Sequence, residues 1–153
     1  MLEFLETSFK IILILGLSSL IGYEREMRQK GAGLKTHILV GLGSTLIVLT
    51  SLHLFEIYKD ATFIDPTRMI AGITTGIGFL CAGTIIQAES RVRGLTTAAA
   101  LWIVSGVGIA VGAGHYSAAI IVAVVVFFVL VKMRAVEHHI TKKIKSNILT
   151  GGQ

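Results

Sequence analysis

The stretch FLCAGTIIQAESRVRGLTTAAALW, residues 79–102, places a charged segment between two long apolar runs. Its charges lie in Glu89-Ser90-Arg91-Val92-Arg93, and Gly94-Leu95-Thr96-Thr97 follows directly. Over the whole chain, 53% of the residues are hydrophobic and only 15% are charged. The surface of a soluble domain normally carries more charge than this. The sequence therefore indicates a membrane protein in which the charged segment is a loop between two spanning helices.

Uncharged runs on either side of this loop predict the number of crossings. A helix needs about 20 apolar residues to cross roughly 30 Å of hydrocarbon. Residues 36–55 and 69–88 each fit one crossing, whereas residues 95–131 would form a helix about 55 Å long. The glycines in Gly112-Ala113-Gly114-His115 favour a turn, so this run is expected to form helices at 95–112 and 117–133. With a first crossing that starts near Phe4, the fold class is an all-α integral membrane protein with five spanning helices.

Basic residues are distributed unevenly between the loops, which predicts the orientation. Cytoplasmic loops carry an excess of lysine and arginine. Of the 14 such residues, most lie in three segments on one side, namely Arg25, Arg28, Lys30 and Lys35, then Arg91 and Arg93, then Lys132, Arg134, Lys142, Lys143 and Lys145. We therefore expect the amino end outside and the carboxyl end in the cytoplasm. In the simplest interpretation, the charges of the opening stretch only fix this topology.

The domain organisation follows from the same runs. Residues 1–133 are expected to form the transmembrane domain, and residues 134–153 a short basic amphipathic cytoplasmic tail. In the tail, Met133, Val136, Ile140 and Ile144 share one helical face, which is typical of a segment at an anionic lipid surface. The amino end, MLEFLETSFK, is acidic and does not resemble a signal peptide, so the first apolar run is expected to be retained.

Glycines at helical spacing predict faces for close packing. Small residues at intervals of four or seven let two helices approach until van der Waals contact holds them together in lipid. The expected packing residues are Gly72, Gly76 and Gly83 in the third span and Gly108 and Gly112 in the fourth. The alternative for some of them is a place in the wall of a polar cavity. Packing between copies would give a homo-oligomer, with a dimer favoured.

An internal repeat emerges when the chain is aligned with itself at an offset of 61 residues. Gly33-Leu34-Lys35-Thr36 then falls on Gly94-Leu95-Thr96-Thr97, and Ser44 falls on Ser105. Duplication of a hairpin would give a parallel repeat about an axis along the membrane normal, followed by a fifth helix. The alternative is that Gly-Leu-x-Thr suits a helix start independently, with the glycine ending the loop and a threonine hydroxyl capping the helix.

The outer loop before the third span contains Asp65-Pro66-Thr67-Arg68, a helix-start signal with Asp65 as the cap and Pro66 in the first turn. Arg68 is the basic residue nearest the membrane on this side, and an ionisable group at that depth usually has a partner or a function. One interpretation is an Asp65–Arg68 ion pair. The other is an outward polar mouth for a cation or small solute, formed by Asp65, Arg68 and Glu56.

Five segments resemble, in order, the landmarks of the MgtC/SapB family of bacterial inner-membrane proteins. They are LIGYER at 20–25, AGLKT at 32–36, DPTR at 65–68, GIGFLCAG at 76–83 and VRGLTTAAALW at 92–102. The resemblance implies a five-helix domain in the inner (cell) membrane and a link to magnesium limitation and survival inside host cells. It also implies binding to other membrane proteins, such as the proton-translocating ATP synthase. Many members carry a soluble carboxyl-terminal domain, whereas only a short segment follows Val131 here. Either no role that rests on such a domain is expected, or the sequence is part of a longer protein.

Three classes of function fit this chain to different degrees. An enzyme is the least expected, because the sequence contains no nucleophile–base pair, phosphate loop or metal cluster. We accordingly expect no cofactor, no metal site built from histidines and no nucleic-acid partner. A transporter or channel for Mg2+, H+ or a small solute is the alternative, although the later spans carry no charge at mid-depth. The favoured hypothesis is a protein that binds and regulates other membrane proteins.

A polar cluster on the cytoplasmic side is expected to carry this function. If the two hairpins pack side by side, Glu24 becomes a partner for Arg93, whose planar fork of donors a lysine cannot copy. The expected binding or gating cluster consists of Glu24, Arg25, Arg93, Gly94, Thr96 and Thr97. It would either hold a partner protein or form the inner gate of a cavity.

Overall fold

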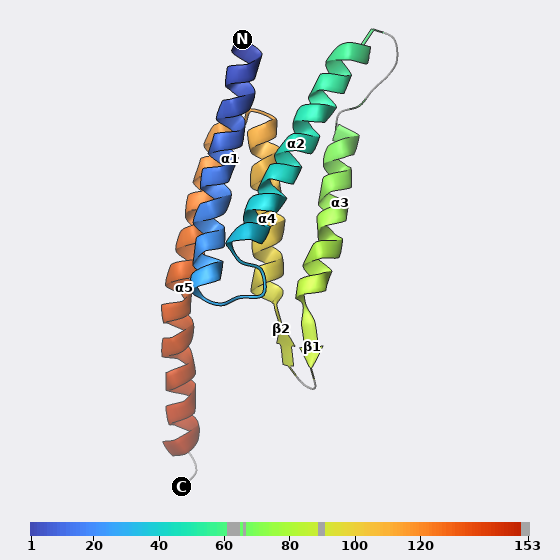
Figure 1. Ribbon diagram of the computed structural model, residues 1–153. Coiled ribbons are helices and arrows are strands. Elements are labelled where there is room, and N and C mark those ends of the chain that lie inside the picture. Colours follow the sequence, from blue (N-terminus) through green and yellow to red (C-terminus); the bar gives the residue numbers. More distant parts are fainter. Residues whose placement is uncertain (61–64, 66, 89–90, 151–153) are drawn as a thin grey trace.

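A computed structural model describes the chain except residues 61–64, 66, 89–90 and 151–153, and it describes no side chains at residue 88 or from residue 134 onward. The described part contains five helices (Figure 1), namely α1 (Leu2–Met27), α2 (Leu34–Tyr58), α3 (Thr67–Thr84), α4 (Leu95–Gly112) and α5 (Tyr116–Thr150). A short hairpin of β1 (Ile86–Ala88) and β2 (Arg91–Arg93) joins α3 to α4. The prediction of a helical fold is therefore confirmed.

Four of the described helices are long and apolar enough to cross a membrane, namely α1, α2, α4 and the Tyr116–Met133 part of α5. The chain is thus a multi-pass membrane protein. Helix α3 lies beside α2 and α4 in the bundle (Figure 1) but is not among the four. Its 18 residues include Arg68 and several glycines and threonines, which lower its hydropathy.

The hairpin between α3 and α4 differs from the expectation that the third helix continues to residue 88. Helix α3 ends at Thr84, and Ile86 pairs with Arg93 across the antiparallel strands. Gly94 explains this early end, because its φ is +91° and a Cβ placed there would lie 1.9 Å from the carbonyl oxygen of Thr84. After the hairpin, the backbone at Gly94 therefore passes directly against the end of α3. Only glycine fits at this close contact.

Charged residues inside α1 explain why this helix extends beyond its uncharged core at residues 11–23. Near the amino end, Lys10 Nζ lies 2.8 Å from Glu6 Oε1, one helical turn away. Near the carboxyl end, Glu24 and Arg25 form a buried ion pair. These four charges thus have partners within the helix, which continues from Leu2 to Met27. The predicted limits of α4 and the turn before α5 agree with the structure, where Gly114 has a φ of +83°.

Helices α2 and α4 form the centre of the bundle and are in close contact at residues 41–48 of α2, whereas the far end of α2 leans away from α4 (Figure 1). A Cβ at Gly108 would lie 2.6 Å from the carbonyl oxygen of Gly41, and one at Gly112 would lie 2.8 Å from Val48 Cβ. Thr45 Oγ1 also donates a hydrogen bond of 2.9 Å to the carbonyl oxygen of Gly108. The predicted glycine face of α4 therefore lies at a close contact between two helices.

The remaining helices are arranged around this centre in a two-fold pattern. Helix α1 packs on α2 and α4, and α3 packs on α4 and more lightly on α2. The hairpins α1–α2 and α3–α4 thus take equivalent places on either side of the α2–α4 contact (Figure 1). Helix α5 packs on α1 and α4, where its Ala119 and Ala123 join the buried cluster that contains Ala100 and Val104.

Candidate functional site: a polar cavity at one end of the bundle

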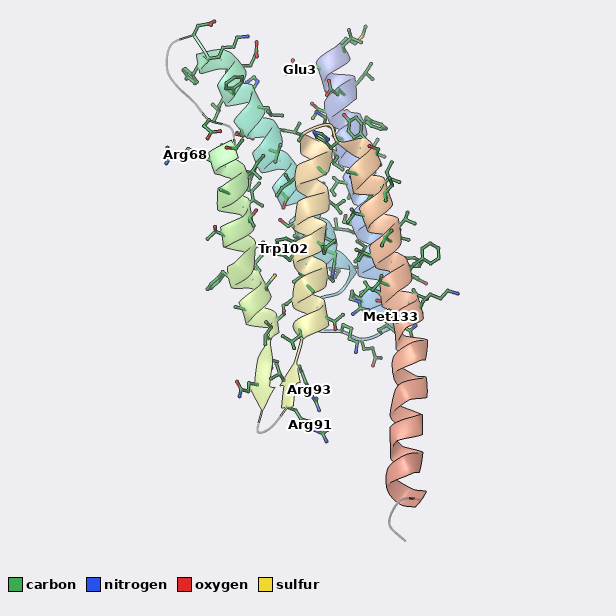
Figure 2. The ribbon with its side chains drawn as sticks, turned by 180° about the vertical axis from the view of Figure 1, so that it is seen from behind. Glu3, Arg68, Arg91, Arg93, Trp102 and Met133 are labelled. Atoms are coloured by element: carbon green, nitrogen blue, oxygen red, sulfur yellow. The ribbon has the colours of Figure 1, made fainter. Side chains whose placement is uncertain are left out.

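A cavity of about 620 Å³ lies where the end of α1, the start of α4 and the side of α5 meet. We call it the polar cavity. Its charged and hydroxyl-bearing residues are Glu24, Arg25, Arg28, Lys30, Thr96 and Thr97, and Gly94 and Leu95 complete that wall. The opposite wall is apolar and comes mainly from Val129, Leu130 and Met133 of α5. Met133 is labelled in Figure 2, at the same end of the bundle as the hairpin.

One carboxylate in the polar cavity is shared by two arginines. The side chains of Glu24 and Arg25 are both 5% exposed, and Arg25 Nε donates to Glu24 Oε2 at 2.5 Å. Arg28 Nε donates to the other oxygen, Glu24 Oε1, at 3.3 Å. Buried charges normally require such pairing, because desolvation of a lone charge costs several kcal/mol. With Lys30 also in the lining, the polar cavity carries three positive groups against one negative group.

The first turn of α4 opens into the polar cavity. The amide of Ala98 donates to the carbonyl oxygen of Gly94 at 2.9 Å, which is the first hydrogen bond of the helix. The amides of Leu95, Thr96 and Thr97 precede it and have no helical acceptor, as at every helix start. Gly94 has no side chain to cap them. Thr97 is only 3% exposed, and its hydroxyl has no hydrogen-bond partner among the described residues. The expected cap from a threonine hydroxyl is therefore not formed.

The start of α2 provides a direct comparison, because it occupies the same place under the 61-residue offset. There the amide of Leu34 donates to Glu26 Oε2 at 3.0 Å. Gly33 makes room for this carboxylate, since a Cβ at that position would lie 1.7 Å from Glu26 Oε2. The start of α2 thus binds an anionic group from its own chain, whereas the start of α4 faces the open polar cavity.

The structure brings together five members of the expected cytoplasmic cluster, namely Glu24, Arg25, Gly94, Thr96 and Thr97. Arg93 is not among the cavity-lining residues. Figure 2 shows Arg91 and Arg93 on the hairpin, beyond the start of α4. The carboxylate of Glu24 is occupied by Arg25 and Arg28, and the expected Glu24–Arg93 pair is not formed in the described part of the chain.

Sequence reasoning did not include Arg28 and Lys30 in the cluster. The spacing of four residues from Glu24 to Arg28 was a usable signal, because such residues are neighbours on a helix. Lys30 gave no comparable signal. It lies after the end of α1, where the turn before α2 determines its place.

His37 lies close to this site but does not line it. It is fully buried, its Nδ1 lies 2.8 Å from the carbonyl oxygen of Gly33, and its Nε2 has no partner among the described atoms. Gly22 allows α1 to pass closely, since a Cβ there would lie 2.9 Å from His37 Cβ. Within the described residues, no group of three or more His, Cys, Asp or Glu side chains is placed to hold a metal ion.

At the opposite end of the bundle, Asp65 caps the start of α3. Its Oδ1 accepts hydrogen bonds from the hydroxyl and the amide of Thr67, at 2.6 Å and 2.9 Å. The hydroxyl of Thr67, then its amide, and then the nearby charge of Arg68 hold the pKa of the Asp65 carboxyl below its usual value. No ion pair joins Asp65 to Arg68 among the residues the structure describes, and the predicted position of Pro66 lies outside them.

The expected outward mouth is only partly assembled. Glu56 pairs with Lys59 Nζ at 2.5 Å and lines a cavity of about 430 Å³ between α1 and α2. The other polar lining residues are Glu3, Glu6, Thr7, Lys10, Thr50 and His53, which sequence reasoning did not place there. Asp65 and Arg68 do not line this cavity and lie at the exposed start of α3.

A third hollow is an apolar groove of about 680 Å³ between α2 and α3, which we call the α2–α3 groove. Gly72 and Gly76 form part of its wall, together with Leu39, Gly43 and Leu80. A Cβ added at Gly72, Gly76 or Gly83 would meet no described atom within 4 Å. The predicted packing face of α3 is therefore uncovered in the single chain, in contrast to that of α4.

The fold and these hollows define a class, the polytopic helical membrane proteins that have a polar cavity at one end of the bundle. Residues 11–139 match the model of the MgtC family, and the chain belongs to that family. A relative in Escherichia coli K12, named "Putative magnesium transporter YhiD", is 39% identical over 127 residues, covering 82% of this chain and 59% of the relative. Protein MgtC of Salmonella typhimurium LT2 is 37% identical over 126 residues, covering 82% of this chain and 52% of the relative.

An uncharacterized protein of Haemophilus influenzae is 37% identical over 121 residues, covering 76% of this chain and 51% of the relative. The chain thus spans only slightly more than half the length of these relatives. No solved structure matches it significantly.

Proposed function

We propose that this protein acts in the bacterial inner membrane during magnesium limitation, stress or virulence, by binding and regulating other membrane proteins. The polar cavity is the observation that carries the proposal. It lies at one end of the bundle, beside a hairpin whose Arg91 and Arg93 are exposed and available to a partner (Figure 2). The proton-translocating ATP synthase is a candidate partner, on the basis of the family resemblance.

The proposal includes five crossings, with α3 as one of them, and an orientation that places the polar cavity in the cytoplasm. Lys30, Arg91 and Arg93 at this end support that orientation, because cytoplasmic loops are rich in lysine and arginine. We also propose that the hairpins α1–α2 and α3–α4 arose by duplication. The two-fold pattern of their contacts supports a parallel repeat, to which α5 was added.

Transport of Mg2+ or H+ is the alternative, and the name of the YhiD relative favours it. The charge of the polar cavity argues against a divalent cation there, because Arg25, Arg28 and Lys30 outnumber the single carboxylate of Glu24. Reconstitution of the purified protein in liposomes separates the two functions. The regulatory proposal expects no saturable Mg2+ or H+ flux above that of protein-free liposomes, together with crosslinking to a membrane partner in cells. Saturable flux would instead establish transport.

We further propose that two copies associate through the α2–α3 groove. On α4, Ala100 and Val104 belong to the buried cluster that Ala119 and Ala123 of α5 complete. The 61-residue offset relates these two positions to Leu39 and Gly43 of α2, which line the groove, and Leu39 is 68% exposed. The groove is thus the counterpart of the place that α5 occupies, and we propose that it accepts a spanning helix.

The direction of that helix favours a second copy of this chain as the occupant. Successive helices run in opposite directions (Figure 1), so α5 runs antiparallel to α4. A helix in the counterpart groove would run antiparallel to α2, in the direction of α3. A two-fold axis along the membrane normal presents α3 of a second copy in this direction, with Gly72 and Gly76 at the contact. The oligomeric state of a Gly76→Leu variant tests this dimer.

A further inference from the structure

We propose that the polar cavity binds a phosphate group, held at the start of α4. The ligand is either a free phosphate or the headgroup of an anionic phospholipid, and the same chemistry recognises both. This inference deepens the proposed function. It rests on that function only because the proposed function assigns a binding role to the polar cavity. A protein that regulates no partner could still bind phosphate here, so the two ideas are tested by separate measurements.

The start of α4 supplies the donors. The amides of Leu95, Thr96 and Thr97 lack helical acceptors, and an 18-residue helix adds the positive end of its dipole. Thr97 provides an independent observation, because its side chain is 3% exposed, lines the cavity and makes no hydrogen bond to any described residue. Because the residue is otherwise buried while its hydroxyl oxygen is not enclosed, the hydroxyl is open to the polar cavity and free to donate to an acceptor bound there. A phosphate oxygen is such an acceptor.

The start of α2 shows what kind of group a helix start of this sequence holds, although Gly33 is extended and Gly94 has a φ of +91°. It has the same Gly-Leu-x-Thr sequence, and there the carboxylate of Glu26 lies 3.0 Å from the amide of Leu34. On α4 the corresponding amide belongs to Leu95, and the space in front of it is the polar cavity rather than a side chain of this protein. The chain therefore satisfies one helix start with its own anion and leaves the other open to an anion from outside.

Charge and shape agree with this assignment. Arg25 is engaged with Glu24, whereas Lys30 forms no ion pair in the described part of the chain, so Lys30 is free to approach a phosphate. The volume of about 620 Å³ exceeds that of a phosphate alone. Val129, Leu130 and Met133 form the apolar wall, which would accommodate the glycerol and upper acyl chain of a lipid. Both sources of phosphate thus fit.

Binding is measured on the purified full chain with two probes. Calorimetric titration with inorganic phosphate, at constant ionic strength, tests the free anion. Native mass spectrometry with phosphatidic acid, compared with phosphatidylcholine, tests the headgroup. We expect saturable binding of at least one probe, and the one that binds identifies the source. Thr97→Val and Lys30→Gln should each weaken this binding about tenfold, the effect expected when one charge-assisted hydrogen bond is lost.

Matched controls come from the other helix start and the same loop. Thr97→Ser keeps the hydroxyl and should bind within about twofold of the wild type. Thr36→Val makes the same change at the start of α2, and Lys35→Gln removes the same charge outside the polar cavity, so neither should alter binding. Absence of saturable binding for both probes overturns the inference. Equal losses in Lys30→Gln and Lys35→Gln would also overturn it, because they would indicate attraction by net charge alone.

If phosphate binds as expected but Lys30→Gln leaves partner crosslinking and growth at low magnesium unchanged, the inference stands and the proposed function fails at this site. If partner crosslinking is intact in a protein that binds neither probe, the proposed function stands alone.

Discussion

The hydroxyl oxygens of Ser44 and Ser105 lie 2.9 Å apart in the buried contact between α2 and α4. The two serines are separated by 61 residues, which is the offset of the proposed internal repeat. Residues that are equivalent in two copies of a unit meet one another only near the axis that relates the copies. The Ser44–Ser105 hydrogen bond therefore lies where the pseudo-two-fold axis of the bundle should pass.

This geometry predicts non-additive effects at the two serines. Ser44→Ala or Ser105→Ala alone leaves one buried hydroxyl without its partner and should lower the free energy of unfolding by about 1 kcal/mol. The double variant removes both hydroxyls and should be no less stable than either single variant. Unfolding of the purified protein in mixed detergent micelles measures these differences. Strictly additive losses would show that the two hydroxyls do not depend on each other.

The glycines of α3 and α4 should respond differently to the same substitution. Gly108→Leu should destabilise the single chain by several kcal/mol, because a Cβ at Gly108 already lies 2.6 Å from the backbone oxygen of Gly41. Gly76→Leu places its side chain where no described atom lies within 4 Å, so the fold should persist while the proposed dimer dissociates. Thermal unfolding and light scattering in detergent measure the two effects. A Gly76→Leu protein that keeps the oligomeric state of the wild type contradicts the proposed interface.

Much of the fold could be predicted from the sequence because hydropathy and glycine spacing report directly on membrane helices. The run beginning at Leu95 and the turn at Gly114 are examples. The hairpin was not predictable in the same way, since residues 85–88 are as apolar as the helix before them. The early end of α3 depends on the contact between Gly94 and Thr84, which lie ten positions apart and meet only in the folded chain.

The candidate site was predictable in part for a similar reason. The repeat inferred from the sequence predicted that Glu24 and Thr97 lie at the same end of the bundle, and in the structure both line the polar cavity. The partner of Glu24 could not be read from spacing alone, because Arg25, Arg28 and Arg93 all offer a guanidinium at this end. Arg25 is on α1 and Arg28 is its C-cap, so both reach the carboxylate without any tertiary contact.

The crossing of α3 can be tested by labelling both of its flanks. In a Cys81→Ala background, a cysteine introduced at Ser90 should react with an impermeant reagent only from the cytoplasmic side, and one at Asp60 only from outside. The expectation follows from the basic residues near Ser90 and from the length of α3. Labelling of both positions from one face would show that α3 does not cross the membrane.

Substitutions of Arg93 distinguish a role in membrane topology from a role in binding a partner. Topology requires only positive charge, which Arg93→Lys preserves, whereas a carboxylate or phosphate on a partner can bind the planar guanidinium at two points. Arg93 is exposed and has no ion pair among the described residues, so its donors are available (Figure 2). We expect Arg93→Ala and Arg93→Lys to insert normally and to reduce growth at low magnesium, the alanine variant more strongly.

Arg91→Lys is the matched control on the same strand. Thr96→Val changes the adjoining wall of the polar cavity, and we expect this variant to show a similar loss of growth. Because Arg93 itself does not line the polar cavity, phosphate binding should remain within about twofold of the wild type in Arg93→Lys. Loss of growth with phosphate binding intact would place partner recognition on the hairpin and anion binding at the start of α4. Wild-type growth of Arg93→Lys would instead show that this arginine only fixes the membrane topology. The surface that binds the partner would then have to lie elsewhere.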